Sequence, residues 1–471
     1  MKYDIAIVGG GASGLSAAVA AAESGKSVVV IEANKKMGGN GVFPMGIYAV
    51  DSPVQKQMLV YATTEDAFLQ CMEYSHWKLD AKLVRTIINK TGSTISWLQD
   101  MGVVFEKVMH HTPNQNPEVF HIVPRPMNTG RAVMEALEKR AAELGVALIG
   151  GTRAKKLVQA EDGTVCGVIA QNSDGETVEI EAPKVILAAG GFGGNNDLIA
   201  KYFPKYNPNN YLHMHGIRHN GEGVIMALEA GADVEGNFAM EMGAPKIVGH
   251  NDITLLLSKP FAMWLNLDGE RFTNEGNVFN FTDCANACSR EKDGVVFVLL
   301  DQRLKDHVLE VGRDPLERIT VPQGAEERLE DGIAKAIEDG LMCVSEQLRD
   351  IAAFIGVSED KLRSTIDEYN ACCAVGYDTY FAKERASLLP FGEGPYYIIR
   401  AGVDMIATHG GIRVNTDFQA LDADRKPIPG LYIAGTDVGG LDADVYNMTM
   451  SGHAFGFAVN TGRLAGESAS R

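Results

Sequence analysis

The first 32 residues, MKYDIAIVGGGASGLSAAVAAAESGKSVVVIE, decide the fold. Residues 3–8 read YDIAIV, and their mostly aliphatic side chains are typical of a buried parallel strand. A glycine-rich turn follows, and a small-residue helix is predicted over residues 15–24. Residues 28–31 predict a second strand, which ends at Glu32. The order strand, turn, helix, strand and acid predicts a βαβ unit that binds a dinucleotide.

Three glycines of the turn each have a structural role in a dinucleotide-binding fingerprint. Gly9, Gly11 and Gly14 have the spacing G-x-G-x-x-G. The first glycine makes the tight turn, the second lets the backbone approach a pyrophosphate, and the third lets the helix pack on the strand. Glu32 is placed to accept hydrogen bonds from a ribose 2′-hydroxyl and would repel the 2′-phosphate of NADP. A glycine-rich turn without a ligand is the alternative, and the fingerprint alone does not separate NAD from FAD.

Other glycine-rich segments favour the longer flavin cofactor. The loop 33–40 reads ANKKMGGN, the mid-chain segment 184–195 reads KVILAAGGFGGN, and the C-terminal segment 430–437 reads GLYIAGTD. A helix is predicted from about residue 451 to 462. A flavin must be gripped far from its adenosine, which explains why the C-terminus returns to the cofactor. Asp437 is then expected on the ribityl chain or pyrophosphate, and the N-terminus of the last helix would support negative charge on reduced flavin.

Composition narrows the possible partners. The 471 residues carry a formal net charge of −18, which disfavours nucleic acid and anionic lipid. No apolar run approaches the ~20 residues of a membrane helix, and the N-terminus enters a strand without a signal-like segment, so a cytoplasmic protein is expected. The seven cysteines are scattered and are expected to be reduced thiols. The histidines at 110, 111, 121, 213 and 215 lack metal-ligand spacing, so no metal site is predicted.

Across almost its whole length the chain resembles the flavoprotein superfamily of fumarate reductases, succinate dehydrogenase flavoprotein subunits, urocanate reductases and 3-ketosteroid dehydrogenases. This resemblance implies an α/β fold: a doubly wound, Rossmann-like FAD-binding domain over residues 1–236 and 391–471, interrupted by an α+β capping domain over residues 237–390. Besides the fingerprint, the matching segments are Gly38–Asn40, Ala188–Phe192, Trp264–Glu275, Thr408–Gly411, Ile428–Gly435 and Thr461–Glu467.

The resemblance also implies a set of FAD-binding residues. They are Gly9, Gly11, Ala12, Ser13, Gly14, Glu32, Ala33, Gly38, Gly39, Asn40, Gly41, Ala154, Ala189, Gly190, Gly191, Asn195, His409, Gly410, Gly435, Thr436, Asp437, Ser451 and Gly452.

The chain departs from the fumarate-type pattern at the residues that bind dicarboxylates. Ile406 replaces a substrate-binding histidine, Thr282 replaces a proton-donating arginine, and segment 443–452 replaces a carboxylate-clamping arginine. Arginine pairs with carboxylates bidentately, so fumarate and succinate are poor candidates. Gly41 stands where some members carry a covalent FAD histidine, so noncovalent FAD is expected. No haem or FMN module is expected, so electrons would arrive from an external donor or a separate reductase.

Four residues are candidates for catalysis. Tyr446 resembles a tyrosine of the steroid-dehydrogenase branch and ranks first as the proton donor; a buried structural tyrosine is the alternative. His409 ranks second, with an ordinary core histidine as its alternative. Arg271 and Glu275 match a family motif, although an ion pair that closes the cap onto the FAD-binding domain is favoured for them.

These observations predict a cytoplasmic FAD-dependent ene-reductase or dehydrogenase. Its small substrate would carry a C=C bond conjugated to a carbonyl, with hydride transfer at flavin N5. Two alternatives stay open: a desaturating dehydrogenase or oxidase that runs in reverse, and a flavoprotein subunit that relays electrons within a larger complex.

Overall fold

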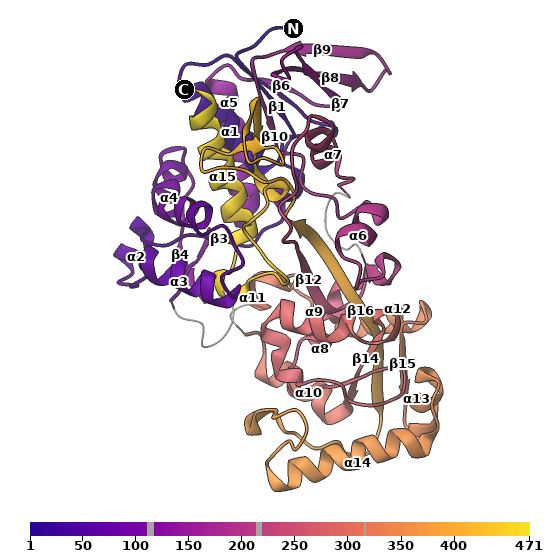
Figure 1. Ribbon diagram of the computed structural model, residues 1–471. Helices are drawn as coiled ribbons and strands as arrows, with labels where there is room; N and C mark the ends of the chain where they lie inside the picture. Colours follow the sequence, from indigo (N-terminus) through magenta and orange to yellow (C-terminus); the bar gives the residue numbers. More distant parts are fainter. Residues whose placement is uncertain (111–116, 213–218, 315–316) are drawn as a thin grey trace. The chain divides into compact units, whose positions relative to one another are not determined.

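A computed structural model describes residues 1–110, 117–212, 219–314 and 317–471 (Figure 1). The chain separates into two compact units whose bounds differ from the predicted ones, because residues 204–212 and 391–406 lie in the second unit and residues 237–241 lie in the first. Unit 1 comprises Met1–Phe203, His215–Glu241 and Ala407–Arg471, and unit 2 comprises Pro204–Met214 and Met242–Ile406. The assignment of unit 2 as a substrate cap stays a prediction.

A six-stranded sheet forms the centre of unit 1. Its order is β17-β18-β10-β1-β2-β6, and every pairing except that of the edge strand β17 is parallel. The central strands are aliphatic and buried on both faces, as expected of a covered parallel sheet. The strands are β1 (Ile5–Val8), β2 (Val28–Ile31), β6 (Ala147–Ile149), β10 (Lys184–Leu187), β17 (Gln419–Leu421) and β18 (Pro427–Ile433).

The first and last long helices of the chain pack against each other in unit 1. Helix α1 (Ala12–Glu23) and helix α15 (His453–Ala469) lie side by side in Figure 1. A Cβ atom on Gly462 would come within 2.1 Å of the carbonyl oxygen of Ser13. Small residues therefore let the two helices approach closely, which brings the C-terminus of the chain back to the fingerprint turn.

Smaller elements complete unit 1. Two three-stranded sheets have the orders β3-β5-β4 and β7-β8-β9. The strands are β3 (Ile47–Tyr48), β4 (Lys107–Met109), β5 (Phe120–Ile122), β7 (Thr152–Gln159), β8 (Val165–Asn172) and β9 (Thr177–Glu181). The helices are α2 (Pro53–Gln57), α3 (Thr64–Tyr74), α4 (Ala81–Asp100), α5 (Thr129–Glu143), α6 (Asn196–Tyr202) and α7 (Glu222–Glu229).

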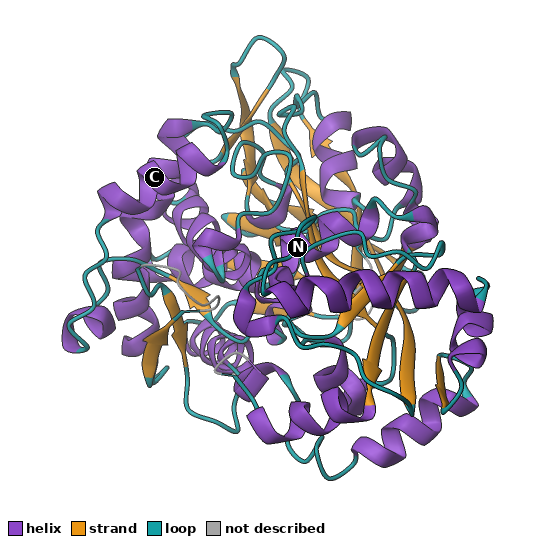
Figure 2. Ribbon diagram, turned by 90° about the horizontal axis from the view of Figure 1, so that it is seen from below, coloured by secondary structure: helices purple, strands orange, loops and turns teal. Residues whose placement is uncertain are grey.

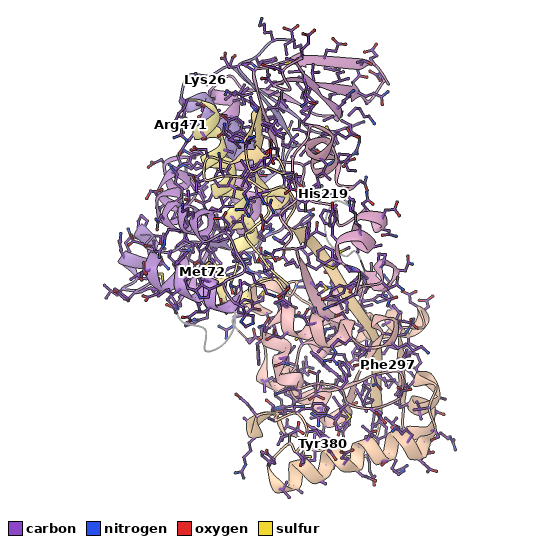
Figure 3. The ribbon with its side chains drawn as sticks, viewed as in Figure 1. Lys26, Met72, His219, Phe297, Tyr380 and Arg471 are labelled. Carbon is purple, nitrogen blue, oxygen red and sulfur yellow. The ribbon has the colours of Figure 1, made fainter. Side chains whose placement is uncertain are left out.

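Unit 2 is built on a sheet with the order β11-β16-β14-β13, and β15 also pairs with β16. Its core includes Phe297 of β14, labelled in Figure 3. The strands are β11 (Tyr211–Leu212), β13 (Met263–Leu265), β14 (Val296–Asp301), β15 (Met342–Ser345) and β16 (Tyr396–His409). The helices are α8 (Thr254–Leu257), α9 (Phe281–Ser289), α10 (Gln302–Val311), α11 (Glu317–Thr320), α12 (Leu329–Glu338), α13 (Leu348–Ile355) and α14 (Glu359–Val375). Strand β12 (Ala239–Lys246) crosses from unit 1 into unit 2.

The predicted α/β class is confirmed, and helices and strands recur throughout the chain (Figure 2). Element bounds differ in detail from the predicted ones. Helix α1 begins at Ala12 rather than Leu15, because Gly11 already serves as its N-cap. The last helix begins at His453 and extends to Ala469, beyond the predicted end. None of the helices in the described ranges is long and apolar enough to cross a membrane.

Candidate functional site: a dinucleotide cradle and an acid–imidazole chain

The fingerprint turn has no room for side chains where the sequence predicts close packing. Gly9 has φ 107°, and a Cβ atom on it would lie 2.2 Å from the carbonyl oxygen of Ala188. A Cβ atom on Gly14 would lie 1.8 Å from the carbonyl oxygen of Gly9. By contrast, a Cβ atom on Gly11 would meet only the carbonyl oxygen of Gly38, at 4.0 Å. The second glycine therefore faces open space at the N-terminus of α1, where a pyrophosphate would bind.

Glu32, the acid that follows β2, is held in place by the fingerprint turn and by the loop after β2. Glu32 is buried, and its Oε2 accepts a hydrogen bond from the Gly10 N–H at 2.8 Å. Its Oε1 accepts hydrogen bonds from the backbone N–H and the side-chain amide of Asn34, both at 2.8 Å. Each carboxylate oxygen can accept more than one hydrogen bond, so ribose hydroxyls can still bind.

The mid-chain and C-terminal glycine segments are tied together by one buried carboxylate. Asp437 accepts hydrogen bonds from the N–H groups of Ala189 at 2.9 Å and Gly191 at 2.8 Å. Burial raises the pKa of Asp437 to about 6, although these backbone donors oppose the rise. Asp437 therefore holds the Ala188–Gly191 loop beside the Gly435–Asp437 segment. The expected bond to the ribityl chain or the pyrophosphate stays a prediction.

A chain of alternating carboxylates and imidazoles lies next to these loops in unit 1. His409 Nε2 is 3.4 Å from Glu241 Oε2, and His409 Nδ1 is 3.4 Å from Asp442 Oδ2. His453 Nε2 is 3.0 Å from Asp442 Oδ1. We call Glu241, His409, Asp442 and His453 the acid–imidazole chain. Three of its members, all but Glu241, line one small cavity together with Gly435 and Thr436, and so the chain borders the predicted cofactor loops.

The charges of this chain support one another. Burial opposes a charged imidazole, but the hydrogen bond with Glu241 and the charge of Asp442 outweigh it and raise the pKa of His409. Burial likewise opposes a charged carboxylate at Asp442, but His453 and His409 outweigh it and lower its pKa. The surroundings therefore favour the protonated form of His409 and the ionised form of Asp442.

Tyr446 packs directly against the two imidazoles. Its ring stacks on His453 with a centroid distance of 4.2 Å and an interplanar angle of 20°, and its centroid lies 5.1 Å from that of His409. The Tyr446 hydroxyl accepts a hydrogen bond from the Ala454 N–H at 3.3 Å, at the N-terminus of α15. Burial, with the charges of Glu241 and Asp442, raises its pKa well above the ordinary value.

Comparison with known proteins decides the family. The family described as "FAD binding domain" matches residues 4–446. The chain belongs to this FAD-binding family. The match covers nearly the whole chain, so the expected cofactor, FAD, and the expected kinship are confirmed, and the protein is an FAD-dependent oxidoreductase.

Similar members of the FAD-binding family include reductases. The vinyl phenol reductase of Lactiplantibacillus plantarum is 31% identical over 485 residues, which cover 100% of this chain and 97% of that protein. The urocanate reductase of Eggerthella lenta is 29% identical over 93% of this chain and 70% of its own length.

Solved structures agree with the fold. The open conformation of a flavocytochrome c3 fumarate reductase has a TM-score of 0.78 at 24% identity, over 100% of this chain and 78% of that one. A 3-ketosteroid-Δ4-(5α)-dehydrogenase from Rhodococcus jostii has a TM-score of 0.75 at 22% identity, over 100% of this chain and 97% of that one. At these identities the structures support the fold alone.

The residues of unit 1 fit FAD on two structural observations. The first is the open space beside Gly11. The second is Thr436, whose buried Oγ1 has no hydrogen-bond partner among the residues that the structure describes. A buried hydroxyl without a partner is costly, and a polar group of the cofactor would satisfy it. The neighbouring Gly435 N–H is already bonded to Thr461 Oγ1 at 2.9 Å.

Some predicted FAD ligands have other partners in the structure. Asn195 caps α6 through the N–H groups of Asp197 and Leu198. Ser451 Oγ donates to the carbonyl of Met448 at 2.9 Å. The remaining predicted ligands lie in unit 1, in the first turn of α1 (Ala12 and Ser13), in β7 (Ala154) and in the short connecting segments (Ala33, Gly38, Gly39, Asn40, Gly41, Gly190, Gly410 and Gly452).

Arg271 and Glu275 have a structural explanation within unit 2. Arg271 bonds Glu275 at 2.8 Å and Asp378 at 2.8 Å, and Lys383 lies 3.3 Å from Glu275. The guanidinium also lies between the rings of Tyr369 and Phe381, at 4.8 and 4.9 Å. The positive charges of Arg271 and Lys383 balance the negative charges of Glu275 and Asp378. The ion pair expected to join the cap to the FAD-binding domain therefore has its partners inside unit 2 itself.

The sequence did not reveal several residues that the fold brings together. Glu241, Asp442 and His453 come from separate segments, and only their contacts with His409 and Tyr446 mark them. His219 (Figure 3) was also missed: its ring would lie 2.8 Å from a Cβ atom on Gly190, beside the cradle. The Asn220-Gly221 turn that follows His219 was the available signal.

The described residues contain no metal-binding cluster and no disulfide. No group of three or more potential ligands could hold a metal ion there. All seven cysteines are free thiols. The histidines at 111, 213 and 215 lie outside the described residues.

Proposed function

We propose that the protein reduces a C=C bond conjugated to a carbonyl or a similar electron-withdrawing group, with Tyr446 as the proton donor. Reduced FAD, when bound, supplies a hydride to one carbon of the double bond. The observation that carries this proposal is the Tyr446 hydroxyl: it accepts a hydrogen bond from Ala454, but its own hydrogen has no acceptor among the described residues. That hydrogen is available to a substrate carbon.

His409 is the less suitable direct donor because of its contacts. Each of its ring nitrogens already faces a carboxylate, one on Glu241 and one on Asp442. A substrate would have to break one of these contacts to receive its proton. Its raised pKa and its place beside the Tyr446 ring suit it better to stabilising the tyrosinate that remains after proton donation.

The charge around Tyr446 argues against a dicarboxylate substrate. Glu241 and Asp442 both lie close enough to Tyr446 to raise its pKa. A neutral or singly charged substrate fits this environment better, because like charges would repel a second carboxylate.

A phenol-conjugated alkene is a second candidate substrate class. A relative that this chain matches over its whole length is a vinyl phenol reductase. Glu241 has 22% of its side chain exposed, so its carboxylate can accept a hydrogen bond from a substrate hydroxyl. In this alternative the C=C bond would be conjugated to a hydroxyphenyl ring instead of a carbonyl.

An anaerobic flavin reoxidation screen tests the function. The holoenzyme is reduced with dithionite and mixed in turn with enones, singly charged unsaturated acids, 4-vinylphenol and fumarate, while flavin absorbance is followed. We expect at least one neutral or singly charged alkene to reoxidise the flavin rapidly. Fumarate should not reoxidise it at a useful rate. No reoxidation by any alkene would favour a relay subunit. Flavin reduction by the saturated products alone would favour a desaturase.

The electron donor is proposed to be a separate molecule. The NADH:fumarate oxidoreductase of Klebsiella pneumoniae is 24% identical to this chain, which spans 48% of its length. That relative therefore carries roughly as much sequence again beyond the matched part. We expect NADH alone to reduce the flavin of this protein slowly, and an added flavin reductase to accelerate the reduction.

A further inference from the structure

Asp442 is a buried carboxylate that joins two imidazoles. It is 3% exposed, and its two oxygens lie 3.0 and 3.2 Å from His453 Nε2. Its Oδ2 also lies 3.4 Å from His409 Nδ1. One side chain therefore fixes the last residue of β16 and the first residue of α15 relative to each other.

The outer nitrogens of both imidazoles also face oxygen acceptors. His453 Nδ1 lies 3.1 Å from the Met450 carbonyl, and His409 Nε2 lies 3.4 Å from Glu241. Because carbonyls and ionised carboxylates only accept hydrogen bonds, the ring nitrogens have to donate. The arrangement orients both rings, and the two carboxylates that face His409 favour positive charge on that ring.

The two rings that Asp442 fixes are the ones that touch Tyr446. His453 stacks on the phenol ring, and His409 packs against it at an angle of 50°. Donation of the Tyr446 proton leaves a negative charge on the phenol oxygen of a side chain that is only 3% exposed. Oriented positive groups in such a site stabilise developing charge without having to reorganise.

We propose that Asp442 is a positioning residue, which holds the imidazoles of His409 and His453 against Tyr446 so that they stabilise the tyrosinate formed on proton donation. This inference rests on the proposed role of Tyr446 as the acid. In that step hydride from reduced FAD adds to one carbon of the double bond and the π bond breaks. The π electron pair forms a C–H bond with the Tyr446 proton on the other carbon, and the electron pair of the broken O–H bond stays on the phenol oxygen. Solvent later returns the proton.

The surrounding titratable groups define the pH behaviour expected of this arrangement. Within unit 1, the groups that face His409, Tyr446 or Asp442 are Glu241 from β12, His453 from α15 and Cys71 from α3. Burial, with the charge of Asp442, raises the pKa of Cys71 to about 12, so this thiol stays neutral. Glu241 and Asp442 are then the anions that raise the pKa of His409. Removing either one should lower that pKa and move the loss of activity to lower pH.

The test compares Asp442→Asn with Asp444→Asn in the holoenzyme, using an alkene that reoxidises the wild-type flavin. Asp444 lies two residues away, is exposed and pairs with Lys78. It has φ 64°, which asparagine tolerates, so it is a matched control. We expect Asp442→Asn to keep FAD, to lower kcat by about 10- to 100-fold with little change in KM, and to move the basic limb of the kcat–pH profile down by roughly one unit or more. The control should match wild type.

Glu241→Gln is the second variant, in case Asp442→Asn fails to fold. It lies at the more exposed end of the acid–imidazole chain and should move the same limb in the same direction. An unmoved basic limb in every folded variant at the two carboxylates would overturn the proposal and leave Asp442 a purely structural group. Wild-type turnover in Tyr446→Phe would instead refute the proposed acid itself. The two failures are therefore distinguishable.

Discussion

At the scale of single residues, Glu32 is the residue predicted to bind the ribose of the cofactor. Its carboxylate is held by the N–H groups of Gly10 and Asn34. Both the residue and its neighbours were predictable from sequence, because the βαβ fingerprint fixes their spacing along the chain. The bond from Asn34 was not predictable, since it depends on how the loop after β2 turns back.

We expect Glu32→Ala to weaken FAD binding without unfolding the apoprotein. The variant loses charge-assisted hydrogen bonds to the ribose, worth about 1.5–3 kcal/mol, which corresponds to a rise in Kd of roughly 10- to 150-fold. Fluorescence titration of the apoprotein with FAD measures the Kd, and circular dichroism checks the fold. Asp4→Ala, which removes an exposed carboxylate bonded to Ser27, serves as a control. Unchanged affinity in Glu32→Ala would remove the ribose assignment.

At Tyr446, the expected role rests on one hydroxyl. Tyr446→Phe should keep FAD, the fold and substrate affinity, but slow turnover by ~10²–10⁴-fold, the usual effect of removing a general acid. Stopped-flow reoxidation of the reduced variant by an active alkene measures this. His409→Ala should slow turnover less, because His409 stabilises the tyrosinate without donating the proton. A dead His409→Ala beside an active Tyr446→Phe would reverse the ranking.

Among the elements, the pair α1 and α15 shows how a local rule can be outweighed by packing. Gly462 and Gly466 lie inside α15, where glycine costs roughly 1 kcal/mol relative to alanine. Both positions face α1: Cβ atoms there would lie 2.1 Å from the Ser13 carbonyl and 2.3 Å from the Ala17 carbonyl. The sequence predicted a helix at this end of the chain, but not its partner.

We expect Gly462→Ala to destabilise the protein, although helix propensity alone predicts that alanine is stabilising at this position. Propensity alone would stabilise the variant by about 1 kcal/mol, whereas a backbone clash at 2.1 Å forces overpacking that costs ~1–3 kcal/mol. Urea unfolding of the apoprotein gives the sign of the change directly. A stabilised variant would show that the two helices separate easily. FAD affinity should fall in the destabilised one, since Ser13 lies on the fingerprint turn.

The domain to which strand β16 belongs could not be predicted from the sequence. Most residues of the strand, Tyr396–His409, are buried, yet we assigned residues 391–406 to the FAD-binding domain. The strand pairs antiparallel with β14 and β15, which places most of it in unit 2. Long-range strand pairing leaves no local mark in a sequence, whereas the parallel βαβ unit at the N-terminus does.

On the scale of the whole molecule, the cofactor and the family were predictable but the acid–imidazole chain was not. FAD follows from glycine-rich segments that recur at both ends of the chain, each with its own local signature. The chain from Glu241 to His453 spans more than two hundred residues and exists only after unit 1 has folded. His409 and Tyr446 were predicted as rivals for one role, and their ring contact supports the complementary roles that we propose for them.

Noncovalent binding of FAD is the last prediction. Gly41 stands at the position of the covalent histidine, and a Cβ atom there would already lie 2.8 Å from Met134 Sδ and 3.2 Å from the Ala12 Cβ. The nearby imidazoles of His409 and His453 are held by carboxylates and a carbonyl. We therefore expect the yellow protein to release all of its FAD on acid precipitation, with flavin absorbance in the supernatant and an unmodified polypeptide mass. Flavin that stays with the pellet, together with a mass increase equal to FAD, would show a covalent link at another residue.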